Sequence, residues 1–144
     1  MATKIDVNVV KLIIISIVPP LGLLLGAVIA NGFIDEIFHA ATQQEALNKV
    51  VLLCYVWALI PAPQVAVAYF AIRDAKHGGI RNALVRRIAP WLLGTGFVAS
   101  LLSIPLYGRF LSLLSDGWRE ATAFTYFTPI FLTYGTMFVS LRRN

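Results

Sequence analysis

The chain has 144 residues, of which 58% are hydrophobic and 13% charged, with a net charge of +5 and a mean hydropathy of +0.77. An ordinary soluble domain is about 25% charged, and membrane-spanning helices of about 20 residues would use most of this length. The composition therefore excludes a separate soluble domain with its own core. Most Lys and Arg residues flank apolar segments, so the positive charge indicates membrane topology and not nucleic-acid binding.

The first predicted membrane span covers residues 12–34. Pro19 and Pro20 are expected to interrupt its helix, because proline has no backbone N–H to donate. Gly22 and Gly26 form a GxxxG pattern, which allows a second helix to approach closely. A cleaved signal peptide would have a shorter apolar region, so this segment is expected to remain as a span.

The segment 35–49 is the first predicted loop, and it is net acidic. Asp35 and Glu36 stand at its start and are candidate contacts for a partner. Thr42 and Glu45 have the spacing of a capping box, which predicts that the second helix begins near Thr42.

The second predicted span covers residues 50–72 and contains no charged residue. Pro61, Pro63 and Gln64 lie near its middle. The two prolines remove backbone donors, and hydrocarbon does not tolerate the amide of Gln64 without a partner. This span therefore needs neighbouring helices that satisfy its polar groups.

A basic loop, residues 73–87, follows the second span. Short loops rich in Lys and Arg remain in the cytoplasm, so this loop is predicted inside and the acidic loop 35–49 outside. Arg81, Arg86 and Arg87 are candidate contacts for anionic lipid or for an acidic partner. Topology alone also explains these charges.

The third predicted span, residues 88–108, is rich in small residues. Gly96 and Ser100 lie four residues apart, which places them on one helix face suited to close packing. The loop 109–120 carries charges of both signs and is predicted outside.

The fourth predicted span, residues 121–141, has threonines around a proline, namely Thr125, Thr128, Pro129 and Thr133. The ring of Pro129 frees the carbonyl of Thr125, and threonine hydroxyls can satisfy such groups. Basic residues after this span place its end in the cytoplasm.

Together these segments predict an all-α integral membrane protein. The fold is a single membrane domain over residues 1–144, a four-transmembrane-helix bundle with proline-kinked helices and both termini inside. The small size and the clear charge asymmetry favour a bacterial cytoplasmic (inner) membrane.

Several residues that could carry chemistry lie near the predicted bilayer midplane: Pro61, Pro63, Gln64, Thr125, Thr128, Pro129 and Thr133. Interrupted helices at one depth can expose backbone carbonyls to an ion or substrate, as in some transporters. Kinks that only shape a compact bundle explain the same residues. No Asp, Glu, Lys or Arg lies within a predicted span, which disfavours proton coupling.

No enzyme or cofactor is expected. His39 and His77 lie in loops predicted on opposite sides of the membrane, so they cannot share a metal or a haem. The only cysteine, Cys54, cannot form an intramolecular disulfide or a paired-thiolate site. No serine has a histidine at a matching depth to activate it.

The sequence favours a protein that acts through contacts with other membrane protein chains. Such a protein is an accessory subunit of a membrane complex, or a protective protein of the immunity or exclusion type. The alternative is a homo-oligomeric channel or facilitator with a pore lined by Gln64 and the threonine face of the fourth span.

Overall fold

The computed structural model describes residues 7–77 and 83–143, and the described residues form helices with short connections and no strand. The elements in chain order are α1 (Val7–Phe38), α2 (Gln43–Leu59), α3 (Pro61–Lys76), α4 (Ala83–Leu102), the 3₁₀ helix η1 (Ile104–Tyr107), α5 (Gly108–Ser112) and α6 (Asp116–Arg143).

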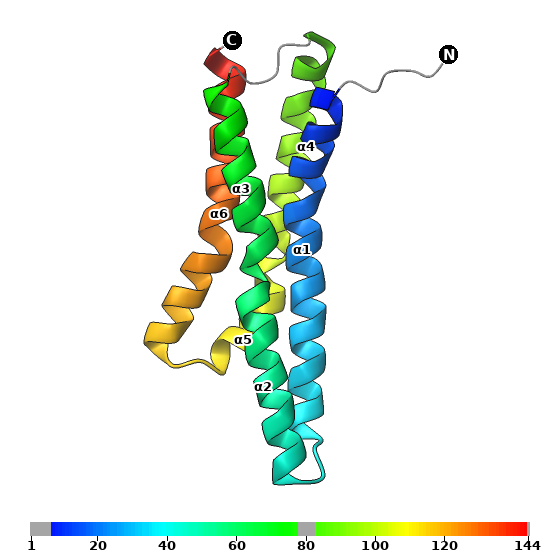
Figure 1. Cartoon of the computed structure of the whole chain (residues 1–144), viewed down its shortest axis with the longest axis vertical. Coiled ribbons are helices and arrows are strands. Elements are labelled where there is room, and N and C mark those ends of the chain that lie inside the picture. Colours follow the sequence, from blue (N-terminus) through cyan, green and yellow to red (C-terminus); the bar gives the residue numbers. More distant parts are fainter. Residues whose placement is uncertain (1–6, 78–82, 144) are drawn as a thin grey trace, which may run out of the picture.

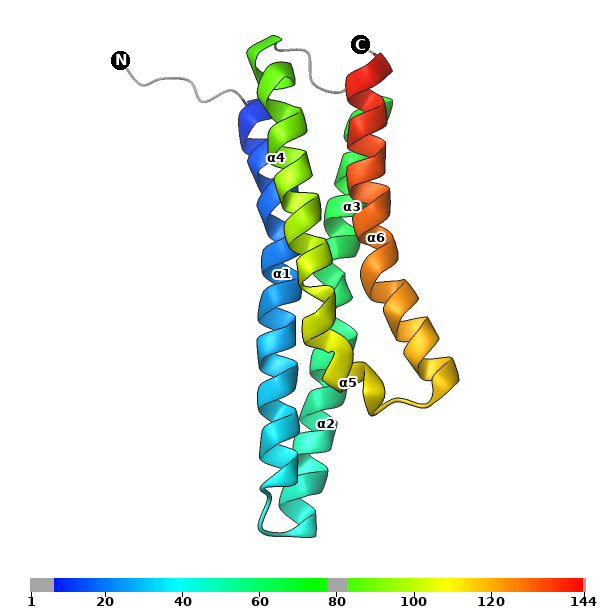
Figure 2. The ribbon, with the colours of Figure 1, turned by 180° about the vertical axis from the view of Figure 1, so that it is seen from behind.

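The long helices lie side by side in a bundle (Figures 1 and 2). α2 and α3 follow each other end to end beside α1, α4 packs along α1, and α6 packs mainly against α3. The start of α1 and the end of α6 lie at the same end of the bundle, whereas the α1–α2 turn lies at the opposite end. There the end of α1, the α1–α2 turn and the start of α2 form a hairpin, called the α1–α2 hairpin below. It extends beyond α5 and the start of α6 (Figure 1).

Three segments are long and apolar enough to cross a membrane: Val9–Phe38, Gln43–Lys76 and Ala83–Ser112. They contain the first three predicted spans. The fourth predicted span lies within α6, whose five threonines make it less apolar than the other segments. A membrane crossing by α6 therefore stays a prediction.

The predicted start of the second helix is confirmed. Thr42 is the N-cap of α2, and its Oγ1 accepts a hydrogen bond from the Glu45 N–H at 3.2 Å. The Glu45 carboxylate in turn accepts from the Ala41 N–H at 3.3 Å. Since α1 continues to Phe38, the connection is much shorter than the predicted loop 35–49.

The prolines act differently from the prediction. α1 runs through Pro19 and Pro20 without interruption, so the expected break there is wrong. In the second span a turn at Ile60, directly before Pro61, separates α2 from α3, where the prolines were expected to remove backbone donors. Within the third span α4 ends at Leu102 and a 3₁₀ helix begins at Ile104, because Pro105 has no N–H to donate to the carbonyl of Leu101 four residues earlier.

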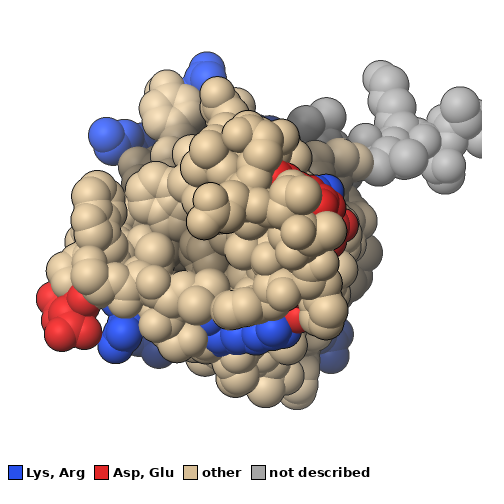
Figure 3. All heavy atoms as spheres, turned by 90° about the horizontal axis from the view of Figure 1, so that it is seen from below, with Lys and Arg blue, Asp and Glu red and all other residues tan. Residues whose placement is uncertain are grey.

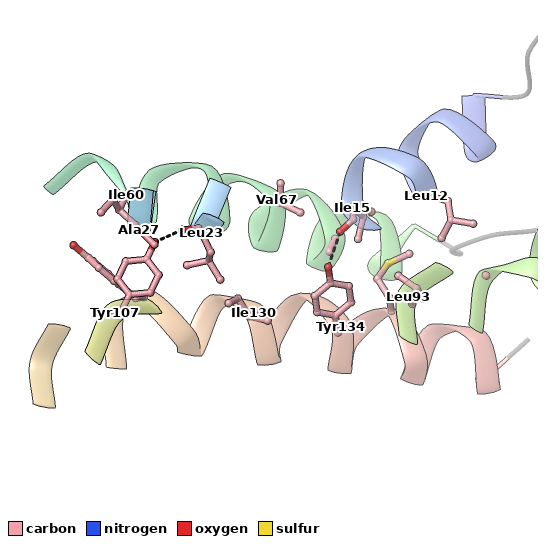
Figure 4. Close-up of a cluster of buried hydrophobic side chains, with 14 of the residues drawn as sticks. Leu12, Ile15, Leu23, Ala27, Ile60, Val67, Leu93, Tyr107, Ile130 and Tyr134 are labelled. Carbon is pink, nitrogen blue, oxygen red and sulfur yellow. Dashed lines mark hydrogen bonds between the residues drawn. The ribbon is translucent and has the colours of Figure 1, made fainter. Parts of the chain in front are cut away.

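The buried core lies between the long helices, and Figure 4 shows the part of it from Ile60 and Tyr107 to Leu12. On α6 the buried positions Thr122, Tyr126, Ile130, Tyr134 and Met137 recur every three or four residues, which places them on one helix face. The outward side chains of all long helices are also mostly apolar and exposed. Such a surface is stable in lipid but not in water.

Candidate intramembrane polar site

The carbonyls freed by Pro19 and Pro20 are those of Ile15 and Ser16, four residues earlier. The hydroxyl of Tyr134 on α6 lies 3.3 Å from the Ile15 oxygen and 3.4 Å from the Ser16 oxygen (Figure 4). Tyr134 is buried, so its proton has these carbonyls as acceptors in place of water. This single hydroxyl partly replaces the two donors that the prolines remove.

A second tyrosine donates to a carbonyl that lacks a proline's N–H, at the junction of α2 and α3. Pro61 has no N–H for the carbonyl of Trp57, and the hydroxyl of Tyr126 donates to that carbonyl at 2.6 Å. The indole N–H of Trp57 donates to Oγ1 of Thr122 at 3.0 Å. Two hydrogen bonds thus join α6 to the last turn of α2.

A third buried tyrosine, Tyr107 of η1, donates to the carbonyl of Leu23 on α1 (Figure 4). Its ring packs edge-on against Tyr126 at a centroid distance of 5.7 Å. Gly26 makes room for this contact, because a Cβ there would lie 2.8 Å from the Tyr107 hydroxyl and 2.8 Å from Cγ1 of Ile60.

Gln64 is fully buried between α1 and α3. Its amide orientation is assigned from its neighbours: Nε2 donates to the Ile60 carbonyl at 2.6 Å, and Oε1 accepts from the Leu23 N–H at 3.3 Å. A Cβ at Gly22 would lie 3.2 Å from this amide, so the glycine gives Gln64 its space. Both polar atoms of the side chain are thus used inside the bundle.

The threonines of α6 bond to their own helix. Thr133 is buried and donates to the Pro129 carbonyl at 2.7 Å, while Thr125 is exposed and donates to the Ala121 carbonyl at 2.8 Å. Thr128 is half-buried. Thr125 and Gln64 therefore do not share a surface.

The prolines of the candidate site are also distributed over different environments. Pro129 is buried, Pro61 is half-buried and Pro63 is exposed. These side chains do not gather around one cavity.

Gly96 and Ser100 lie on the face of α4 that packs against α1. A Cβ at Gly96 would overlap the carbonyl oxygen of Ser16 and lie 2.6 Å from the Tyr134 hydroxyl. Ser100 is fully buried and donates to the Gly96 carbonyl at 2.8 Å. The backbones of α1 and α4 therefore meet at a point where only glycine fits.

The acidic contact candidates are engaged in ion pairs at the hairpin end. Asp35 pairs with Arg109 at 2.6 Å, and Glu36 pairs with Lys49. All four side chains remain at least 31% exposed, so these surface pairs add little stability, about 0–1 kcal/mol each.

The basic contact candidates differ from one another. Arg86 is partly buried, and its Nη2 donates to the Leu141 carbonyl near the end of α6 at 3.2 Å. Arg87 is exposed. Arg81 lies outside the described residues.

The three tyrosines were not predicted from the sequence as residues of this site. The signal was nonetheless present: each proline marks a freed carbonyl four residues earlier, and Tyr126 and Tyr134 lie eight residues apart on one face of α6. Which tyrosine meets which carbonyl depends on helix packing, which the sequence pattern does not specify.

Comparison of the chain with protein-family models, with curated proteins and with solved structures finds no match. Within the described residues, no group of three or more His, Cys, Asp or Glu side chains could hold a metal ion.

Proposed function

We propose that this chain crosses a bacterial cytoplasmic membrane four times, with both termini inside, and acts by binding another membrane protein. The 28 residues of α6 extend about 42 Å, which exceeds the roughly 30 Å of a bilayer core. Its outward side chains Phe124, Phe131 and Val139 are exposed and apolar, which suits contact with lipid. These features support a fourth crossing.

The charge distribution supports the proposed orientation. Arg73, Lys76 and Arg87 lie at the end where α3 finishes and α4 begins, whereas Asp35 and Glu36 lie near the α1–α2 turn. Cytoplasmic loops carry the excess of Lys and Arg. The end with the α1–α2 turn is therefore outside.

The observation that carries the proposed function is the exposed α1–α2 hairpin. Asn31 donates to the Leu106 carbonyl at 3.1 Å, and α1 then continues to Phe38, about 10 Å farther. No side chain of α2 is buried by the described part of the chain. Phe38 and Leu47 are 66% and 56% exposed.

The start of α2 is expected to extend beyond the hydrocarbon. The segment Gln43–Lys76 has 34 residues and measures about 51 Å, against a bilayer core of about 30 Å. Figure 3 looks onto this end, where most of the visible surface is neither acidic nor basic. The exposed apolar side chains of Phe38 and Leu47 near the turn favour contact with a protein partner, as an accessory subunit or a protective protein would use.

Native mass spectrometry after gentle extraction from the chain's own membrane tests this proposal. We expect a foreign membrane protein at fixed stoichiometry, and its loss in the double variant Phe38→Ser, Leu47→Ser. Leu113→Ser is the matched control, because Leu113 is 53% exposed on the nearby α5–α6 connection. A symmetric homo-oligomer without a foreign chain, or retention of the partner by the double variant, would contradict the proposal.

The ion pairs at the hairpin allow a second test that preserves folding. Reversing Glu36 alone would place two cations together, whereas Glu36→Lys combined with Lys49→Glu keeps the intramolecular pair and inverts its charge pattern. We expect the paired exchange to weaken partner binding without changing the helical content measured by circular dichroism.

The pore alternative gains no support from the geometry. Gln64 is fully buried with both amide atoms bonded, and Thr125 faces outward. If Gln64→Leu abolished a measured flux, the pore hypothesis would be favoured again; we expect no flux in either protein.

A further inference from the structure

A pocket of about 510 Å³ lies between the beginning of α1 and the end of α3. The two helices separate there, toward the end that holds the start of α1 and the end of α6 (Figure 1). Its floor is apolar and its rim is charged; the lining residues are Ile14, Ile15, Val67 and Phe70 in the floor, and Lys11, Arg73, Asp74 and His77 in the rim.

The rim has more positive than negative charge. Lys11 pairs with Asp74, with Nζ 2.9 Å from one carboxylate oxygen and 3.2 Å from the other. Arg73 is exposed and forms no ion pair with any described residue. The rim thus holds two permanent cations and the imidazole of His77 but only one carboxylate, which leaves the pocket complementary to an anion.

The position of the pocket matches a membrane boundary. Lys11 precedes the first predicted span, and Arg73 and His77 follow the second, so the rim lies at headgroup level on the side proposed as cytoplasmic. Ile14 and Phe70 are 47% and 57% exposed and lie on the hydrocarbon side of the rim. An arginine fork binds phosphate in a bidentate manner, and basic pockets between membrane helices hold anionic headgroups.

We propose that this pocket binds one anionic phospholipid, with its phosphodiester at Arg73 and Lys11 and an acyl chain against Ile14 and Phe70. A free phosphate ion would leave the apolar floor unused, whereas a lipid uses both parts of the pocket. The proposal rests on membrane insertion as proposed above, and it does not depend on the protein partner.

Lipid titration of the full-length chain by native mass spectrometry tests the site. Phosphatidylglycerol and phosphatidylcholine with the same acyl chains are compared, and we expect tighter retention of phosphatidylglycerol. Removal of one charge near an anionic surface corresponds to about fivefold in affinity. Arg73→Gln should therefore weaken phosphatidylglycerol binding about fivefold. Arg87→Gln, which removes an exposed charge outside the pocket, should change it less than twofold.

A second variant moves binding in the opposite direction. Asp74→Asn removes the carboxylate that occupies Lys11, so phosphatidylglycerol retention should increase. The Lys11–Asp74 pair is 47% and 33% exposed, so its loss should not unfold the bundle, which circular dichroism checks.

Three outcomes would overturn the proposal: equal retention of the two lipids, equal loss in Arg73→Gln and Arg87→Gln, or displacement of phosphatidylglycerol by millimolar inorganic phosphate. The last would assign the rim to a free anion. Flotation of the chain with vesicles tests membrane insertion separately, so a failure of insertion is distinguishable from a failure of the lipid site.

Discussion

The interior formed by α1, α3, α4 and α6 and the α1–α2 hairpin use their polar and apolar groups in opposite ways. In the interior, buried tyrosines donate to carbonyls of α1 and α2, and Gln64 bonds to backbone on both sides. In the hairpin, α2 has no buried side chain, and its charged groups pair only at the surface. The interior polar groups are thus used within the fold, whereas the charged groups of the hairpin remain at its surface.

The largest loss of unfolding free energy should come from a substitution at Gly96, in the interior. Gly96→Leu forces a side chain into the backbone of α1, and overpacking of this kind costs about 3 kcal/mol of unfolding free energy. Gly94→Leu is the matched control, because no described atom lies within 4 Å of a Cβ at Gly94. Unfolding of both variants by SDS, followed by circular dichroism, measures the difference. Similar stabilities would show that α1 and α4 do not meet at Gly96.

A smaller effect is expected at Tyr134. Tyr134→Phe removes the donor to two buried carbonyls, which should cost about 1–2 kcal/mol in the same unfolding measurement. Tyr69→Phe is the control, since Tyr69 is 63% exposed and its hydroxyl has no partner among the described residues.

A rescue experiment separates this role from simple packing. Pro19→Ala with Pro20→Ala restores the two helical N–H donors, so Tyr134→Phe should cost less in that background than in the original chain. An unchanged cost would mean that the hydroxyl does not substitute for the missing donors.

The smallest effect should be found where the hairpin joins the interior. Thr122→Val removes the acceptor of the Trp57 indole and should cost about 0.6 kcal/mol, the average for hydrogen bonds between membrane helices. Thr125→Val is the control, because Thr125 is exposed and bonds only its own helix. A double-mutant cycle with Trp57→Phe isolates the pairwise energy. A coupling energy near zero would mean that the hairpin is held to α6 by packing alone.

The sequence predicted what depends on local patterns. Long apolar runs located three segments able to cross a membrane, and the Thr42–Glu45 spacing located the start of α2. The end of α4 before Pro105 was not predicted although its signal is local, since a proline has no N–H for the carbonyl four residues earlier.

The partners of the polar groups were not predictable in the same way. Threonine hydroxyls were expected to satisfy the carbonyl that Pro129 frees on the fourth span, and no partner was predicted for the carbonyls of Ile15, Ser16 and Trp57. Tyrosines from α6 reach those three carbonyls. These contacts join residues far apart in the chain and depend on the packing of α6 against the rest of the bundle, which no periodicity encodes.

The Tyr134 contact also constrains the order of assembly during synthesis. The donor for the carbonyls of Ile15 and Ser16 is Tyr134, which lies 119 and 118 residues later in the sequence. At about 5–20 residues per second, α1 spends roughly 6 to 24 s in contact with the translocation machinery or lipid before Tyr134 exists. During that interval water or another protein chain can satisfy the two carbonyls, so α1 is the span that depends longest on a temporary donor.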